Sequence, residues 1–397
     1  MRVILMLLCL TFFSCTRRNS PNAYIAKNIE DASLMRRVGS EFQIINVDGA
    51  IKVGMDSLIS RLASVSYIPL ESTDLIGAMD KVLVYNDNIY ILDAYITEKV
   101  FIFDKQGCLL NTIDNKGGGP NEYSGLSGMC IDSIKKELCL NDRLSMDKLY
   151  YDLDGHFLRK EKGIPCFYIN IFHPYVINQL SFGQSFSDDV NYHIVCTIND
   201  SIYCKGFPYA PIQKQYSISA NAVYNSMGDL LFNPTLSDTI YHIKSFNEYS
   251  VRYIIQHKHS IWDKHQEVLS YEEISDLIRN SGYTALGSMF YETSKYIFFT
   301  INRKRDKFIA VKYLFFDKKQ KQVYEMDNSY NKIYVEMILP DLIALDGEVC
   351  IASFDPYRIK EVVTNKGTYT IKNDTLEAII KNSNENSNPV LVLYQLK

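Results

Sequence analysis

The sequence contains Ile89-Tyr90-Ile91-Leu92-Asp93, then Lys99-Val100-Phe101-Ile102-Phe103-Asp104 and Gly107, and it repeats this pattern once further on. The second copy is Leu138-Cys139-Leu140-Asn141-Asp142, then Lys148-Leu149-Tyr150-Tyr151-Asp152 and Gly155. Equivalent residues of the two copies lie 48 or 49 positions apart. Each copy consists of an apolar strand, a turn, a second strand and a second turn. A period of this length is typical of β-propeller blades, so the pattern predicts a propeller.

The composition agrees with a strand-rich fold. The chain has 397 residues, of which 29 are Tyr, 20 are Phe and one is Trp. Tyr and Phe fit the half-buried surface of a sheet, although faces that bind sugars or peptides are also rich in them. Lysine and arginine together number 42 against 46 aspartates and glutamates, so the net charge is −4. This balance argues against a nucleic-acid-binding surface.

The N-terminus is predicted to be a targeting segment. Arg2 precedes an apolar run at residues 3–10, which is too short to span a bilayer as a mature helix. Ser14-Cys15 follows, and a small residue before a Cys resembles the bacterial lipoprotein signal. The resemblance implies cleavage before Cys15 and attachment of lipid to its sulfur, which would hold the protein at a membrane. An ordinary secretory signal with an incidental Cys is the alternative.

The residues after Cys15 bear on location. Arg17 and Arg18 stand where some related lipoproteins carry an acidic run that directs them to the outer surface. We therefore expect a cell-envelope lipoprotein of the outer membrane that faces the periplasm. The predicted boundaries are residues 1–14 for the signal peptide, 15–40 for a polar tether, 41–64 for a lead-in and 65–397 for the propeller.

Seven cysteines remain after Cys15. An exported protein can form disulfides, but the number is odd and most of these residues lie within apolar strand runs, where thiols are usually buried. We expect mainly free thiols. Cys196 and Cys204 are the one locally plausible pair, across a hairpin.

Blades one and two are predicted in most detail. Blade one has strands near residues 81–85, 89–93, 99–104 and 108–113, and blade two has strands near 128–131, 137–141, 148–151 and 157–160. The loop between them contains Gly117-Gly118-Gly119-Pro120, which calls for special backbone geometry. It is not a phosphate-binding loop, because no Gly-Lys-Ser/Thr follows.

These residues resemble a known family. The features are Ile68-Pro69-Leu70-Glu71, the repeated turns, the Gly-Gly-Gly-Pro-Asn-Glu-Tyr loop at residues 117–123, and later segments near 232–241, 296–300, 315–318 and 388–393. In this order they are similar to the six-bladed β-propeller lipoproteins of gut-type anaerobes and, more loosely, to NHL-like and TolB-like propellers. That family usually has a second Gly where this chain has Asn121, and Asn tolerates left-handed backbone. The resemblance implies no common reaction.

The later part of the chain is predicted to complete the ring. Blade three covers about residues 166–209, blade four 216–256 and blade six 335–364. Residues 268–280 break the strand pattern, since Ser270 and Glu273 form a capping box before an apolar helix face. The fold class is therefore all-β, a six-bladed propeller of four-stranded antiparallel blades with a helical insertion between blades four and five. The strand at residues 390–394 should pair beside the start of the fold and close the ring.

No catalytic motif stands out. His257 and His259 share one face of a strand with His265 nearby, which could bind zinc, but a solvated edge is the blander interpretation. Asp93, Asp142, Asp104 and Asp152 recur at equivalent places, so we expect them to hold turns rather than catalyse. We predict no cofactor and no bound metal.

The candidate binding residues are Glu122 and Tyr123, with Asn121 beside them, because an irregular loop on a rigid scaffold tends to carry function. The alternative is that Tyr123 packs between blades and Glu122 satisfies backbone donors. Arg143 follows a strand end and could face the channel mouth.

Three functions remain open, one of which is a structural subunit whose rim is buried in an assembly. The leading hypothesis is a lipid-anchored binding module without a reaction, whose partner is an envelope protein, a peptide or a glycan. The alternative is a metal-dependent hydrolase, lactonase or lyase with its site in the central channel, which requires acidic, Asn or His side chains to converge there.

Overall fold

The computed structural model of the chain describes residues 21–54, 57, 60–180, 192–199, 201–214, 221–306, 308–326, 342–366 and 373–397. The predicted signal peptide, residues 1–14, and Cys15 lie outside the described residues.

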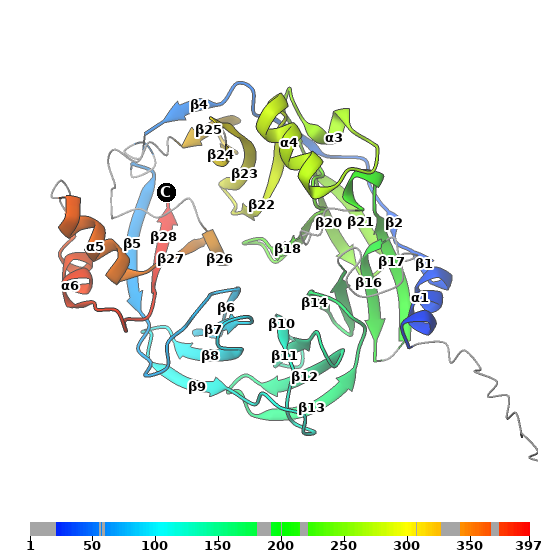
Figure 1. The fold of residues 1–397 in the computed structure, drawn as a ribbon, viewed down its shortest axis with the longest axis horizontal. Coiled ribbons are helices and arrows are strands. Elements are labelled where there is room, and N and C mark those ends of the chain that lie inside the picture. The colour runs from blue at the N-terminus through cyan, green and yellow to red at the C-terminus, as the bar shows by residue number, and fades with distance from the viewer. Residues whose placement is uncertain are drawn as a thin grey trace, which may run out of the picture.

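Six antiparallel sheets stand in a ring around a central channel (Figure 1). Blade one is β6 (Lys81–Tyr85), β7 (Asn88–Asp93), β8 (Lys99–Asp104) and β9 (Leu109–Ile113). Blade two is β10 (Leu126–Asp132), β11 (Glu137–Asp142), β12 (Asp147–Asp152) and β13 (Phe157–Lys162). Blade three is β14 (Tyr168–Phe172), β15 (Tyr175–Gln179), β16 (Tyr192–Ile198) and β17 (Ser201–Pro208).

Blade four is β18 (Asn221–Tyr224), β19 (Leu230–Asn233), β20 (Thr239–Ser245) and β21 (Glu248–Gln256), preceded by a 3₁₀ turn at Pro211–Gln213. Blade five is β22 (Ala285–Glu292), β23 (Tyr296–Arg305), β24 (Phe308–Asp317) and β25 (Gln322–Met326). Blade six is β26 (Leu342–Asp346), β27 (Val349–Phe354), β28 (Val390–Leu396) and β5 (Leu62–Pro69). The predicted six-bladed propeller is confirmed.

The repeated apolar runs form the interfaces between blades. Tyr90 and Leu92 of β7 pack in one cluster with Leu138, Leu140 and Tyr151 of blade two, and all five are fully buried. Both faces of a middle strand are therefore covered, which explains why these strands are continuous apolar runs rather than alternating ones.

The repeated aspartates hold turns, as predicted. Asp93 accepts hydrogen bonds from the backbone N–H groups of Gly77, Ala78 and Ile96. Asp142 accepts from the equivalent positions of blade two, the N–H groups of Ser124, Gly125, Leu144 and Ser145. Each carboxylate ties the loop that enters its blade to the turn that leaves the second strand.

The second turn of each repeat is also the same in both blades. Asp104 accepts from the N–H groups of Gln106 and Cys108, and Asp152 from those of Asp154 and His156. Both turns end in a glycine of positive φ: Gly107 at +91° and Gly155 at +88°. Only glycine adopts this geometry without strain.

The ends of the propeller meet in blade six. β28 pairs antiparallel with β27 on one side and with β5 on the other, with Leu391 opposite both Ser353 and Ile68. The predicted closure of the ring by the C-terminal strand is confirmed.

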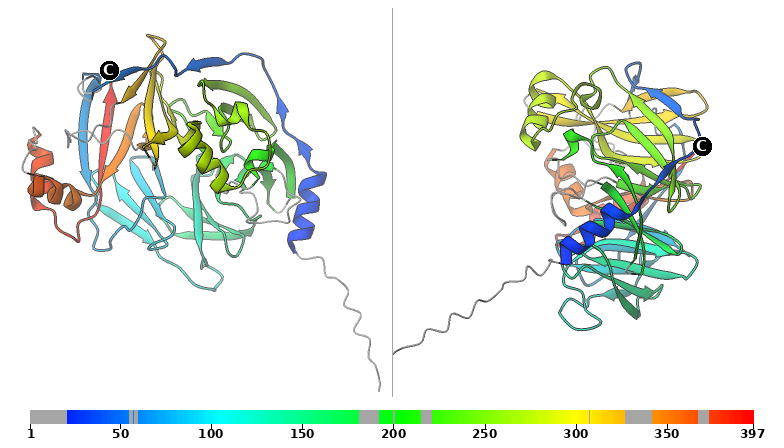
Figure 2. Two further views of the ribbon diagram at one scale, coloured as in Figure 1. Left: turned by 45° about the horizontal axis from the view of Figure 1, so that its top comes forward. Right: turned by 90° about the vertical axis from the view of Figure 1, so that its right-hand side faces the viewer.

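Residues 21–53, predicted to be a tether and a lead-in, lie along the outside of the ring (Figure 2). They form the helix α1 (Pro21–Asp31) and the short strands β1 (Ser33–Leu34), β2 (Arg36–Arg37), β3 (Gln43–Asn46) and β4 (Ile51–Val53). β1 pairs parallel with β17, β2 and β3 with β21, and β4 with β25. We call residues 33–53 the strap. Three blades thus have more than the predicted four strands, because the strap covers sheet edges that would otherwise be open.

The strap is predicted to contribute to stability through its buried side. On β3, Ile45 is 1% exposed against blades four and five, whereas its neighbour Ile44 is 56% exposed. Ile45→Ala should lower the free energy of unfolding by about 2–3 kcal/mol, because it removes buried methyl groups and leaves a cavity. Ile44→Ala on the same strand should change it by less than about 0.5 kcal/mol. Urea denaturation of both variants measures this; equal effects would contradict the placement of the strap.

Two helical insertions lie on the same side of the ring (Figure 2). The predicted insertion between blades four and five is present as α3 (Ile261–Lys264) and α4 (Tyr271–Ser281). Ser270 caps α4 with Glu273 in the predicted capping box, and Ile274 and Ile278 are buried. The second insertion, α5 (Pro356–Lys366) and α6 (Asp374–Asn382), corrects the prediction that residues up to 364 belong to the strands of blade six.

The seven described cysteines are free thiols. Cys196 and Cys204 are direct neighbours across β16 and β17, and both thiols donate to the carbonyl oxygen of Phe246, at 3.0 and 2.7 Å. Within the described ranges, no helix has the length and apolarity needed to cross a bilayer.

Candidate functional site

The central channel encloses a cavity of about 820 Å³. Each of the six innermost strands contributes to its wall, which includes residues of β6, β10, β14, β18, β22 and β26 (Figure 1). Most of the wall is apolar or aromatic. The larger such residues are Val82, Leu83, Val84, Tyr85, Met129, Ile131, Ile134, Tyr168, Ile171, Phe172, Val223, Tyr224, Tyr291, Ile343 and Leu345. A cavity of this size and lining is typical of sites that enclose a small ligand.

The turns after the innermost strands form one rim of the channel, and polar contacts join these turns from blade to blade. His173 Nδ1 lies 2.8 Å from Asp132 Oδ2, between blades two and three. Tyr224 donates its hydroxyl to the carbonyl oxygen of Ile171 at 2.9 Å, between blades three and four. Glu348 of blade six accepts from the N–H of Ser294 in blade five at 3.0 Å.

The acidic groups of the wall are already engaged. Burial raises the pKa of Asp132, but the hydrogen bonds of its own turn and of His173 lower it more, so the net pKa is below its usual value. Asp80 accepts a hydrogen bond from the N–H of Ala94 at 2.7 Å. Burial raises the pKa of Asp80 nevertheless.

Lys81, at the start of β6, places an ammonium group in the cavity wall without a hydrogen-bond or ion-pair partner among the described residues. No hydrogen bond or ion pair joins its ammonium group to any residue in the described part of the chain. Loss of hydration inside the protein lowers its pKa, and the nearby Cys130 thiol opposes this only in part. The side chain is half-buried, and the rest of its environment is the cavity.

Asn170 of β14 is a second unsatisfied group. The residue is 2% exposed, lines the cavity, and its amide nitrogen has no hydrogen-bond partner among the residues that the structure describes. Buried amides without partners are uncommon, and each calls for an explanation such as a ligand or water.

Lys81 and Asn170 lie at similar depth in the channel. Tyr85 at the end of β6 reaches the carbonyl oxygen of Ser133, just past β10, and Asp132 reaches His173, just past β14. The innermost strands β6, β10 and β14 run in the same direction. Lys81 lies four residues before Tyr85, Cys130 three before Ser133 and Asn170 three before His173. Lys81, Cys130 and Asn170 therefore lie at neighbouring levels along the channel. The cavity wall includes all three.

The structure places the predicted binding residues elsewhere. Glu122 folds back so that its carboxylate accepts from the N–H of Gly119 at 2.7 Å. Tyr123 is fully buried between blades one and two, with its hydroxyl toward the carbonyl oxygens of Glu98 and Ile113. Packing between blades by Tyr123 and acceptance from backbone donors by Glu122 are the roles that the sequence analysis gave as the alternative to ligand binding. Neither residue lines the cavity.

Asn121 is exposed in the same loop, and Arg143 lies over the ring of Tyr95 at 5.6 Å. Neither lines the cavity, and ligand binding by the four residues stays a prediction. The sequence analysis missed Lys81 and Asn170. A usable signal existed for Asn170, because a lone amide in the apolar run of β14 is unexpected unless it serves a purpose.

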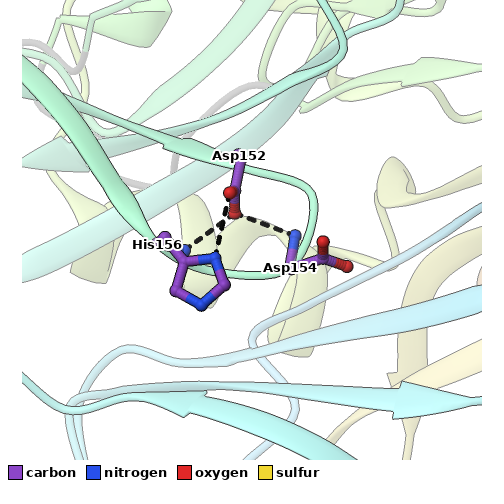
Figure 3. Close-up of side chains that lie close together, drawn as sticks. All are labelled: Asp152, Asp154 and His156. Atoms are coloured by element: carbon purple, nitrogen blue, oxygen red, sulfur yellow. Dashed lines mark hydrogen bonds and ion pairs between the residues drawn. The ribbon is translucent and has the colours of Figure 1, made fainter.

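The described residues contain one group of three side chains that could surround a metal ion: Asp152, Asp154 and His156 (Figure 3). It lies in the outer turn of blade two, where Asp152 accepts from the N–H groups of the other two residues and lies 3.0 Å from His156 Nδ1. The hydrogen bonds that close this turn account for the short distances between the three side chains.

The three histidines that suggested zinc form no such group in the described chain. His257 instead lies between Asp238 Oδ1, at 2.8 Å, and Thr284 Oγ1, at 2.6 Å. His265 contacts Glu267.

Lys81 is expected to cost stability in the free protein. Lys81→Met keeps most of the side-chain volume and removes an unpaired, half-buried charge. It should raise the free energy of unfolding by about 1 kcal/mol. Denaturant unfolding at neutral pH measures the change, and a loss of stability instead would mean that the ammonium group has a partner.

Comparison with known proteins places the chain in a family. The model of a domain of unknown function, DUF4934, matches residues 42–395. The chain belongs to the DUF4934 family. The match begins within the strap and ends in β28, so this family domain includes β3 and β4 of the strap and all six blades.

Two solved structures share the fold of this DUF4934 protein. A "Putative exported protein" from Bacteroides fragilis is 20% identical, with a TM-score of 0.68 over 90% of this chain and 100% of that one. A member of the duf4221 family from Bacteroides vulgatus is 10% identical, with a TM-score of 0.51 over 85% and 97%. No curated protein matches the sequence.

Proposed function

We propose that this DUF4934 protein is a binding module of the cell envelope that takes a small ligand, or the end of a longer one, into the channel of its propeller. The observation that carries the proposal is the cavity of about 820 Å³, whose largely apolar wall holds two polar groups, Lys81 and Asn170, without partners in the described part of the chain. Such a wall, with few polar groups to fix orientation, suits ligand binding. An envelope protein, a peptide or a glycan could each present such an end.

Export is supported by the N-terminal sequence and by the name of the Bacteroides fragilis structure. We propose further that lipid on Cys15 anchors the protein in the outer membrane, facing the periplasm. Cys15→Ala should then move the protein from the membrane fraction to the soluble fraction of cells that express it. Unchanged fractionation would argue against the anchor and leave the binding module untouched.

Binding in the channel can be tested with Nile red, an uncharged dye that fluoresces in apolar surroundings. Val84 lines the cavity, so Val84→Trp should fill part of it and abolish the fluorescence gain seen with the wild-type protein. Leu110 lies in the outermost strand of the same blade and is 54% exposed, so Leu110→Trp is the matched control and should bind as wild type does.

Unfolding curves of both variants establish that they fold. Absence of dye binding to the wild-type protein, or equal binding to folded Val84→Trp, would contradict the proposed site.

A further inference from the structure

We infer that the channel selects an organic anion, a molecule with one carboxylate on an apolar body, and that Lys81 and Asn170 bind the carboxylate. This inference rests on the proposed binding function and names its ligand class.

The first support is the charge that the wall leaves uncompensated. Asp132 is paired with His173 at the rim, and Asp80 is held by the N–H of Ala94. Lys81 has no such partner among the described residues. Partial loss of hydration destabilises an ammonium group that has no anionic partner, and a ligand that brings a negative charge offsets this cost.

The second support is Asn170. Its nitrogen lacks an acceptor among the described residues, and the residue lies at nearly the depth of Lys81, two blades further round the wall. A carboxylate has two oxygens with several lone pairs, so it can accept from the ammonium group and from the amide together. A neutral ligand with a single acceptor would leave one of the two unsatisfied.

The rest of the wall limits what the anion can be. The remaining lining is mainly Val, Ile, Leu, Tyr and Phe, which favours an apolar or aromatic body over a sugar phosphate. A phosphate group is usually bound by several donors or by a bidentate Arg. A single Lys with one amide suits a monocarboxylate better.

The test compares two forms of one fluorescent probe. The acid is 11-(dansylamino)undecanoate, and the neutral form is its primary amide. The wild-type protein should bind the acid about tenfold more tightly than the amide, as expected for a charge-assisted contact. Lys81→Met should bind both forms equally, at the affinity of the amide. Asn170→Leu should weaken acid binding by several-fold and keep part of the preference.

Lys135→Met is the matched control. Lys135 is exposed in the turn after β10, near the same rim, so its loss removes an equal charge without changing the wall. It should keep the full preference for the acid. Val84→Trp should lose both probes, which shows that they bind in the channel.

Equal binding of acid and amide by the wild-type protein would overturn the inference, and so would a preference that survives in Lys81→Met. Nile red binding distinguishes failure of the carboxylate site from failure of the proposed binding function. Dye binding without acid preference contradicts the carboxylate site alone, whereas absence of dye binding contradicts the proposed function.

Discussion

Asp142→Ala is expected to lower the free energy of unfolding by about 4 kcal/mol. The carboxylate is fully buried and accepts from the N–H groups of Ser124 and Gly125, at 2.6 and 3.1 Å, and from the hydroxyl of Ser145 at 2.7 Å. Removing it leaves several buried donors without an acceptor, each of which carries a desolvation penalty. Urea denaturation measures the loss.

Asp154→Ala is the control for this prediction. Asp154 is an exposed carboxylate in the outer turn of the same blade, and its replacement should cost less than about 0.5 kcal/mol. A loss below about 1 kcal/mol for Asp142→Ala would mean that the carboxylate does not tie the loop to the turn.

The same group makes stability depend on pH. Burial raises the pKa of Asp142, but its hydrogen bonds from Ser124, Ser145 and Leu144 lower it more, so the folded-state pKa lies below the usual value. The carboxylate therefore contributes its full stability above the unfolded-state pKa of about 3.9, and this is lost as pH falls through the lower folded value. Asn cannot ionise, so Asp142→Asn lacks this pH dependence. The difference in the free energy of unfolding between the wild-type protein and Asp142→Asn should therefore shrink below about pH 4.

Leu391→Asp is expected to have an effect of similar size at a different place. Leu391 is fully buried in β28, between Ser353 of β27 and Ile68 of β5. An unpaired carboxylate there should cost at least about 4 kcal/mol, because the core offers neither water nor a partner. The strand joins the two ends of the ring, so we also expect faster proteolysis of β5.

Gln395→Asp is the matched substitution on the same strand. Gln395 is exposed, so the same carboxylate remains in water and should change stability by less than about 0.5 kcal/mol. Denaturant unfolding and limited proteolysis of the two variants test the closure. Similar curves for both would show that β28 does not lie in the centre of blade six.

The sequence determined the fold class through local signals that recur. Asp104 and Asp152, with their glycine turns, mark equivalent points of two blades because each turn is closed by its own neighbours along the chain. The capping box at Ser270 is likewise local and was predicted correctly. Apolar runs at a fixed period require stacked sheets, which makes a propeller the expected solution.

The tertiary structure decided the rest. The strap pairs with three blades although its own strands are only two to four residues long, because the open edges it covers come from distant parts of the chain. Likewise, Lys81 and Asn170 are 89 positions apart and become a possible site only where the innermost strands of different blades line one cavity. Neither residue carries a motif, since what makes each unusual is the absence of a partner, and partners are set by packing between blades.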